Sequence, residues 1–159
     1  MRWQIISVGR VREKFYREGT DEYLKRLKPY VPAELVEGLE EKIEPTASPA
    51  QVEHALSREK ERILNYVHED DLLVVLDERG KEMTSKEWAT WLQSLEATGR
   101  SRISFVIGAA NGLHGDLKQR ADYKISLSRM TFLHQMAVLV LTEQLYRAVK
   151  IQRGEPYHR

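Results

Sequence analysis

The run from Leu72 to Leu76, L-L-V-V-L, constrains the fold most strongly because five consecutive aliphatic residues leave no polar face. A strand with one face in water alternates apolar and polar residues, whereas a strand of a parallel sheet is covered on both faces. The next residues, Asp77-Glu78-Arg79-Gly80, are typical of a turn that closes a strand. The run therefore predicts a buried strand of a parallel sheet that lies between layers of helices.

Strand and helix patterns alternate along the rest of the chain. Two capping boxes, Ser48-Pro49-Ala50-Gln51 and Thr84-Ser85-Lys86-Glu87, predict two helix starts. Apolar spacing predicts strands over 3–8, 33–36, 72–76, 103–107 and 123–127, and helices over 16–27, 48–67, 84–95, 116–121 and 134–152. This order, with no linker or repeat, predicts one α/β domain over residues 1–159, with a mostly parallel sheet and helices on both of its faces.

Length and composition limit the classes of protein that remain. A chain of 159 residues can bury a core without disulfides or metals, and it has no cysteine for a disulfide, a thiolate site or a nucleophile. The longest apolar run, Met136 to Leu141, is far shorter than the ~20 residues of a membrane helix. The net charge of +1 shows no global preference for nucleic acid. We expect a soluble, cytoplasmic protein in which any RNA contact is a local patch.

The strand over 103–107 ends in a glycine-punctuated loop, G-A-A-N-G-L, from Gly108 to Leu113. Parallel α/β sheets bind ligands beyond the carboxyl ends of their strands, and glycine lets backbone approach a ligand closely. The loops after Leu76, Gly108 and Leu127 would share that edge of the sheet. They are candidates for a binding site, although an ordinary strand-to-helix turn also explains the Gly108 loop.

Several familiar chemistries lack their sequence motifs. The chain has no phosphate-binding G-x-x-x-x-G-K-[ST] motif, no dinucleotide-binding G-x-G-x-x-G motif and no G-x-S-x-G nucleophile elbow. The histidines show no metal-ligand spacing, so we expect no metal. A ligand held mostly by backbone at the strand-end loops remains.

The last third of the chain contains a helix that one small domain cannot cover. Residues 136–141 are apolar on every side of the predicted helix, which favours a partner subunit and hence a homodimer. Two basic clusters lie near the ends of the chain, and each suits either an RNA contact or a solvated face. They are Arg10, Arg12, Lys14 and Arg17, and Arg147, Lys150, Arg153, His158 and Arg159.

Five segments together resemble one family over nearly the full length of the chain. They are L-D-E-R-G-K (76–81), F-V-I-G-A-A-N-G-L (105–113), L-S-R-M-T-F-L-H-Q (127–135), E-Q-L-Y-R-A (143–148) and P-Y-H-R (156–159). In their order and spacing they resemble the RlmH family, pseudouridine N3-methyltransferases of 23S ribosomal RNA within the knotted SPOUT superfamily. The resemblance implies S-adenosyl-L-methionine as cofactor, a deep trefoil knot in the carboxyl-terminal third, and a homodimer that acts on 23S rRNA in the ribosome through sites shared between subunits.

The resemblance also assigns residues to roles. The cofactor-binding positions of the family fall on Leu76, Gly108, Leu127, Ser128, Arg129, Met130, Thr131 and Phe132. Its substrate-side positions, here the catalytic candidates, fall on Arg147, Tyr157 and His158. Ala109 replaces a glycine and Leu133 a proline that many members carry, which affects the expected geometry of these loops.

The resemblance implies methyl transfer to a nitrogen, which depends mainly on positioning the two reactants. His158 or Tyr157 would accept a proton or orient the base, and Arg147 would hold a phosphate or the charge left on the base. Two other readings of the sequence remain. One is a non-catalytic RNA- or ribosome-binding module without a cofactor, and the other is a flavodoxin-like α/β protein that binds a nucleotide cofactor or only a partner.

Overall fold

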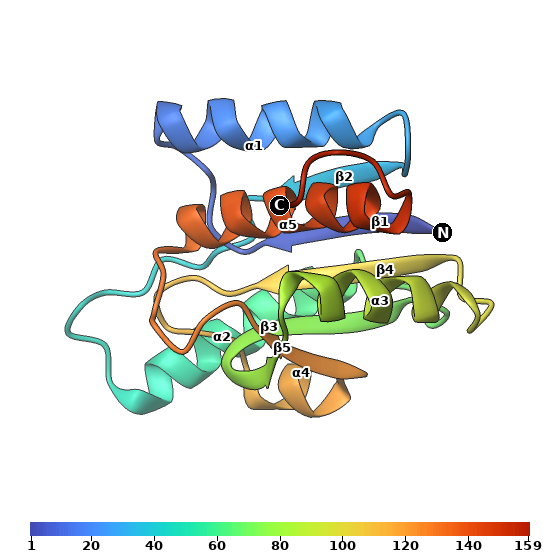
Figure 1. The fold of residues 1–159 in the computed structure, drawn as a ribbon. Helices are drawn as coiled ribbons and strands as arrows, with labels where there is room; N and C mark the ends of the chain where they lie inside the picture. The colour runs from blue at the N-terminus through green and yellow to red at the C-terminus, as the bar shows by residue number, and fades with distance from the viewer.

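The structure, a computed structural model, describes residues 1–159, in which strands and helices alternate from end to end (Figure 1). The strands are β1 (Arg2–Ser7), β2 (Ala33–Glu37), β3 (Leu72–Glu82), β4 (Arg102–Ile107) and β5 (Tyr123–Ser126). The helices are α1 (Lys14–Leu27), α2 (Pro49–Leu64), α3 (Ser85–Glu96), α4 (Gly115–Arg120) and α5 (His134–Gln152). The predicted order of elements is therefore confirmed.

The five strands form one sheet in the order β2-β1-β4-β3-β5, and every pairing is parallel. The registers place Trp3 beside Ile103 and Leu72 beside Ile103, so β1, β4 and β3 begin at one level. Because the strands are parallel, all their carboxyl ends lie at the same edge. The loops that follow β3, β4 and β5 are thereby brought together.

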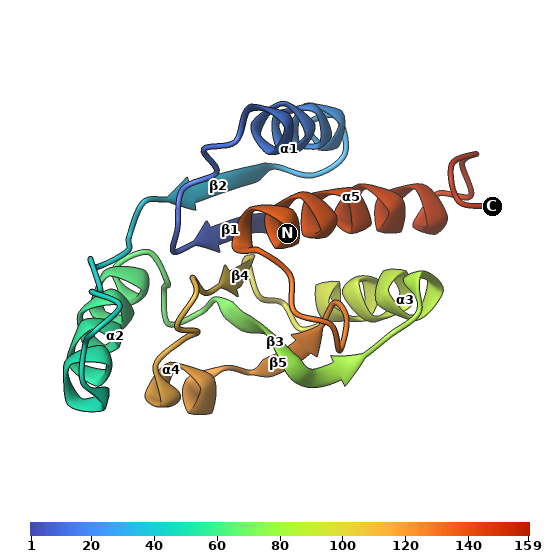
Figure 2. The same ribbon diagram turned by 90° about the vertical axis from the view of Figure 1, so that its left-hand side faces the viewer.

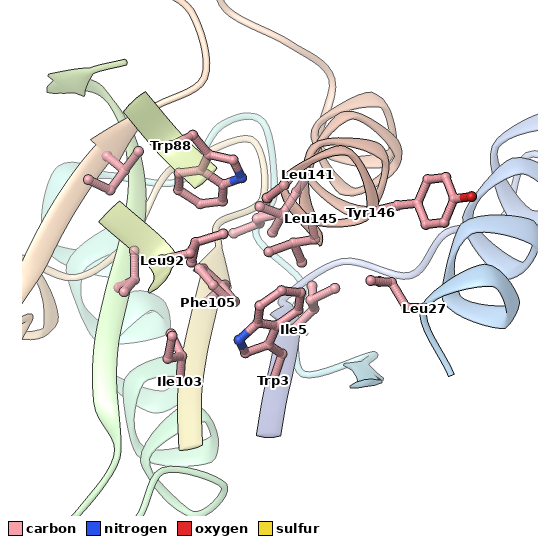
Figure 3. Packing of buried hydrophobic residues seen from close by; sticks show 14 of the residues in the cluster. Trp3, Ile5, Leu27, Trp88, Leu92, Ile103, Phe105, Leu141, Leu145 and Tyr146 are labelled. Carbon is pink, nitrogen blue, oxygen red and sulfur yellow. The ribbon is translucent and has the colours of Figure 1, made fainter. Parts of the chain in front are cut away.

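Successive residues of the central strands point into two separate cores, which explains why these strands are apolar throughout. Ile5, Val74 and Phe105 belong to the larger core, whereas Ile6, Val75 and Val106 belong to the smaller one. The larger core is completed by α1, α3 and α5, and Figure 3 shows Trp88 and Leu92 of α3 facing Phe105. Helices α2 and α4 complete the smaller core, so helices cover both faces of the sheet as predicted.

Both capping boxes begin helices where the sequence predicts them. The Ser48 hydroxyl accepts a hydrogen bond from the Gln51 amide, and the Gln51 side chain accepts one from the Ser48 amide. Thr84 and Glu87 repeat this arrangement at the start of α3. These local bonds satisfy amide groups that the first turn of a helix leaves free, so both starts follow from local sequence.

The end of β3 differs from the sequence prediction. The residues expected to form a closing turn, 77–80, are part of an eleven-residue strand that bulges, because Leu76 and Lys81 both pair with Ile125 of β5. Gly80 permits this close approach, since a Cβ atom there would lie 2.7 Å from the backbone nitrogen of Ile125. Turn-forming residues therefore produce a bulge here, which carries Asp77 and Glu78 beyond the apolar part of the strand.

Helix α5 lies between α1 and α3 and packs over β1 and β4 (Figure 2). Ala137, Val138 and Leu141 are buried against this chain, whereas Met136 points outward and is 36% exposed. Since β5 is an edge strand beside β3, residues 127–133 carry the chain from that edge back across to α5. The trefoil knot implied for this region stays a prediction.

Candidate active site

A cavity of about 290 Å³ lies at the carboxyl ends of β3, β4 and β5. Its walls come from Leu76, from the loop that begins at Gly108, from residues of the 127–132 loop other than Arg129, and from Ala137 in the first turn of α5. These strands are neighbours in the sheet, so the parallel topology alone brings segments about 20 to 50 residues apart in sequence to one place. The three loops predicted to form a site are thus confirmed as neighbours.

Seven of the eight residues predicted to bind the cofactor line this cavity. They are Leu76, Gly108, Leu127, Ser128, Met130, Thr131 and Phe132. Arg129 does not line it, because its side chain is 85% exposed and pairs with Glu82, the last residue of β3, at 3.3 Å. The loop takes part of its shape from local bonds, since the Ser128 hydroxyl accepts a hydrogen bond from the Met130 amide at 3.0 Å.

The sequence suggests that Gly108 lets backbone approach a ligand closely. The structure gives a different reason for glycine at this position. The amide of Gly112 donates to the carbonyl of Ala109 at 2.9 Å, and Gly112 has a φ of 74°, which glycine adopts readily. A Cβ atom on Gly108 would lie 2.9 Å from the carbonyl carbon of Gly112. Glycine is therefore required at 108 so that the loop can fold back on itself, whether or not a ligand is bound.

The cavity also contains ionisable residues that the sequence prediction left out: Asp77, Glu78, Lys118 and His134. Asp77 pairs with Lys118 at 3.4 Å, and the Arg79 amide donates to its other oxygen at 3.0 Å. The amide hydrogen bond, together with the charge of Lys118, outweighs burial and holds the pKa of Asp77 below its usual range. The signal in the sequence was the D-E pair directly after the buried aliphatic run.

His134 lies at the start of α5, and its Nε2 lies 2.9 Å from the carbonyl oxygen of Arg10. A carbonyl only accepts hydrogen bonds, so Nε2 carries a proton. A Cβ atom on Gly9 would lie 2.6 Å from this ring, so the glycine two residues after β1 makes room for the imidazole. The position of His134 in the cavity wall thus depends on residues more than 120 positions away in sequence.

The three catalytic candidates form a second cluster, organised by Glu143 of α5. Arg147 donates to Glu143 Oε1 at 2.6 Å through one terminal nitrogen, and the other lies 3.0 Å from Nδ1 of His158. Tyr157 donates to the same Glu143 oxygen at 3.0 Å and packs edge-on against Tyr146. Sequence reasoning missed Glu143, although its place four residues before Arg147 on a helix was a visible signal.

The surroundings of this cluster fix its protonation. Burial, followed by hydrogen bonding with Tyr23 and Glu143, raises the pKa of Tyr157 far above its ordinary value, so its hydroxyl keeps its proton at neutral pH. The hydrogen bond to Glu143 likewise raises the pKa of Arg147. Because guanidinium only donates, Nδ1 of His158 accepts from Arg147, and any proton on a neutral ring is on Nε2.

Within one chain the two clusters are separate. Ala137 lines the cavity and Arg147 lies ten residues further along α5, which is roughly 15 Å at 1.5 Å per residue. Figure 2 shows the carboxyl-terminal tail at the far end of α5 from the loop that precedes the helix. The structure therefore does not bring Arg147, Tyr157 and His158 to the cavity of their own chain.

Beyond the cavity and the Glu143 cluster, the structure shows neither a metal-binding group of side chains nor a helix that could span a membrane. No group of three or more histidine, aspartate or glutamate side chains is placed to hold a metal ion. None of the helices is both long and apolar enough to cross a membrane. Several cations of the basic clusters are engaged within the chain, among them Arg17 with Glu37 and Lys150 with Glu155.

The fold and cavity define an α/β protein of the class that holds small ligands at the carboxyl ends of parallel strands. Residues 1–158 match the family model described as predicted SPOUT methyltransferase, and the chain belongs to that family. It is 54% identical to the ribosomal RNA large subunit methyltransferase H of Syntrophomonas wolfei and 46% identical to that of Halothermothrix orenii. Each of these alignments covers all of both chains.

Solved structures agree on the fold at much lower sequence identity. The crystal structure of a probable methyltransferase from Bordetella pertussis matches with a TM-score of 0.55 and 17% identity, covering 93% of this chain and 96% of that one. A probable methylase family protein from Haemophilus influenzae matches with a TM-score of 0.53 and 14% identity, covering 99% of this chain and 70% of that one. The family and the α/β fold class predicted from the sequence are both confirmed.

Proposed function

We propose that this chain is an S-adenosyl-L-methionine-dependent methyltransferase of large-subunit ribosomal RNA, and that it methylates N3 of a pseudouridine in 23S rRNA. The observation that carries the proposal is the single cavity that collects seven of the eight family cofactor positions from three separate loops. Relatives that align over their whole length, at 54% and 46% identity, carry the name ribosomal RNA large subunit methyltransferase H. An enzyme of this kind, a single domain over residues 1–159, would work in the cytoplasm, on the ribosome.

The cavity suits a nucleoside-sized cofactor. Its volume of about 290 Å³ lies just below the range of roughly 300–1,000 Å³ for small-molecule sites. Leu76, Ile107, Leu113 and Leu127 line the cavity and would supply apolar walls for a purine. The backbone of the Gly108 and 127–132 loops would bind its polar edge. We assign Leu76, Gly108 and residues 127–132 to the cofactor, with Arg129 at the rim.

S-adenosyl-L-methionine, when bound, supplies an electrophilic methyl group on a sulfonium. The residues of the tail would orient the nucleotide, not deprotonate it. Tyr157 keeps its proton because of its raised pKa, and His158 offers an Nε2 proton while Nδ1 accepts from Arg147. Arg147, held by Glu143, would contact a phosphate or the charged base. An imide nitrogen is acidic enough that positioning provides most of the rate.

We further propose that the active form is a homodimer with shared sites. Phe15 is 63% exposed, Leu133 54% and Met136 36%, and all three lie where α1 and α5 begin. These two helix starts are adjacent, since the amides of Arg12 and Glu13 both donate to the side chain of Gln135 at 2.8 Å. A second copy would cover these apolar side chains and would bring its tail to the cavity, which one chain alone cannot do.

Two measurements test the proposal: calorimetric titration with S-adenosyl-L-methionine, and an assay of methylation of large ribosomal subunits. Deletion of Tyr157 to Arg159 should lower the methylation rate at least about 100-fold while cofactor affinity and dimerisation stay near wild type. The wild-type chain serves as the control, with methylated pseudouridine measured by mass spectrometry. If the wild type does not bind the cofactor, the non-catalytic RNA-binding alternative is favoured instead.

Mixing two defective chains tests whether the sites are shared. A Gly108→Val chain should lack a working cavity, and a chain without residues 157–159 should lack a working tail. A heterodimer of the two keeps one intact cavity opposite one intact tail if the tail acts on its partner's site. Activity should then return to about a quarter of the wild-type level in a statistical mixture. Heterodimers that form and stay inactive would rule out the shared site.

A further inference from the structure

The cavity wall carries one negative charge that no cation in the chain balances. The Asp77 charge is matched by Lys118 at 3.4 Å. Glu78 forms no ion pair, and its Oε2 accepts a hydrogen bond from the Thr131 hydroxyl at 2.8 Å. That bond joins the β3 bulge to the 127–132 loop, and both residues line the cavity. Glu78 is solvent-exposed, and this bond positions its carboxylate at the wall as the one unpaired acidic charge.

A fixed charge in this place matters because methyl transfer changes the charge of the cofactor. The S–CH₃ bond breaks, an N–CH₃ bond forms, and the imide proton leaves to solvent. The sulfur keeps the bonding electron pair and becomes a neutral thioether, so the ligand loses one positive charge. A carboxylate at the wall attracts the two forms unequally, whereas apolar contacts and backbone hydrogen bonds do not distinguish them.

We propose that Glu78 determines specificity for charge: it favours the sulfonium cofactor over the thioether product, S-adenosylhomocysteine, and so limits inhibition by product. The inference rests on the proposed function, because it concerns the same cavity. Thr131 is the positioning residue, since its hydroxyl fixes the carboxylate at the wall. Neither Asp77 nor Lys118 can supply this preference while they are paired, because their charges cancel.

The test compares the affinities of S-adenosyl-L-methionine and S-adenosylhomocysteine for the same protein by calorimetry. Glu78→Gln keeps an oxygen that can accept from Thr131 and removes only the charge. We expect this variant to bind the sulfonium about fivefold more weakly relative to the thioether than the wild type does. The ratio of the two affinities cancels every contact that the ligands share, and the effect should shrink as the salt concentration rises.

Two further variants test the direction in which the affinity ratio changes and whether the change requires a charge in the cavity wall. Glu82→Gln removes a charge from β3 just after the bulge, but neither Glu82 nor its partner Arg129, which is 85% exposed, lines the cavity, so the affinity ratio should stay unchanged. Lys118→Met keeps most of the length of the side chain and leaves the charge of Asp77 unpaired. It should shift the ratio in the opposite direction, towards the sulfonium.

The outcomes separate this inference from the proposed function. If Glu78→Gln lowers the affinities for both ligands equally, Glu78 only holds the loop through Thr131, and the charge-based inference is wrong. An unchanged ratio in both Glu78→Gln and Lys118→Met also overturns it. Failure of the wild type to bind either ligand would instead contradict the proposed cofactor, and it would be seen before any variant is compared.

Discussion

The two ends of the parallel sheet use polar side chains in opposite ways. At the amino end, Asp71 accepts hydrogen bonds from Arg102 at 2.8 Å, from Ser104 at 3.1 Å and from the His68 amide at 3.0 Å. Gln4 extends this group by donating to the Ser104 hydroxyl at 2.9 Å. Every member is paired within the chain, and the Asp71 side chain is only 2% exposed.

At the carboxyl end the polar groups surround a cavity and leave binding capacity unused. Glu78 has no cation, and Nδ1 of His134 forms no hydrogen bond within the chain. Buried groups that are fully paired fix a structure, whereas groups with free capacity at a cavity are available to a ligand. The comparison indicates that the amino end of the sheet holds the fold and the carboxyl end is kept for chemistry.

The largest difference between the two ends should appear when the cation at the amino end is removed. Arg102→Met leaves the buried carboxylate of Asp71 without a charge partner, so the free energy of unfolding should fall by about 3 kcal/mol. Affinity for S-adenosyl-L-methionine should not change at a temperature where the variant is folded. Urea unfolding and calorimetry measure the two quantities.

The matched control is Arg129→Met at the carboxyl end. Arg129 pairs with Glu82 across 3.3 Å, but the two side chains are 85% and 56% exposed. Exposed pairs contribute little, so we expect a change below about 0.5 kcal/mol. Equal losses of stability in the two arginine variants would contradict the division between a structural end and a functional end.

A smaller effect should follow from a methyl group in the cavity loop. Gly108→Ala places Cβ 2.9 Å from the backbone of Gly112, so the loop has to shift, and affinity for the cofactor should fall about tenfold. Gly115→Ala is the control, because a Cβ atom there has no neighbour within 4 Å. Calorimetry should show near wild-type affinity for Gly115→Ala, and equal affinity in both variants would remove the loop from the site.

Much of the fold could be predicted from the sequence because its causes are local or periodic. The aliphatic run 72–76 indicated burial on both faces, and residues 72–75 do alternate between the two cores. The capping boxes at Ser48 and Thr84 depend on residues three positions apart, so the sequence contains the whole interaction. The strand-end loops could be grouped because a parallel topology leaves them no other place.

Other features depend on contacts between distant segments, which one sequence does not reveal. The bulge at 77–80 exists because β5 pairs on both sides of it, and β5 lies more than 40 residues further on. Glycine at 108 is required by Gly112, and this reason differs from the close approach to a ligand that the sequence suggested. The pairing of Asp71 with Arg102 joins the bend before β3 to the first residue of β4, and neither residue stands out in its own segment.

The smallest effect we predict is a difference in acid stability between the two ends. Burial raises the pKa of Asp71, but the hydrogen bonds from Arg102, His68 and Ser104 outweigh it and leave the pKa below the ordinary value of 3.8. A carboxyl with a lowered pKa stabilises the folded state above its unfolded pKa, and that stabilisation is lost as the pH falls through the folded pKa. Asp71→Asn should therefore be less stable than wild type at pH 7, and the gap should narrow below about pH 3.8.

Asp77→Asn makes the same comparison at the carboxyl end. The pKa of Asp77 is also lowered, chiefly by the Arg79 amide, but this residue lies on a bulge at the rim of the cavity. We expect the same sign and a smaller gap, because water partly replaces the lost interactions there. Unfolding followed by circular dichroism between pH 2 and pH 7 measures both gaps. If the difference in stability between wild type and Asp71→Asn does not change with pH, the ionised carboxylate does not stabilise the amino end. The paired cluster would then stabilise the fold by packing alone.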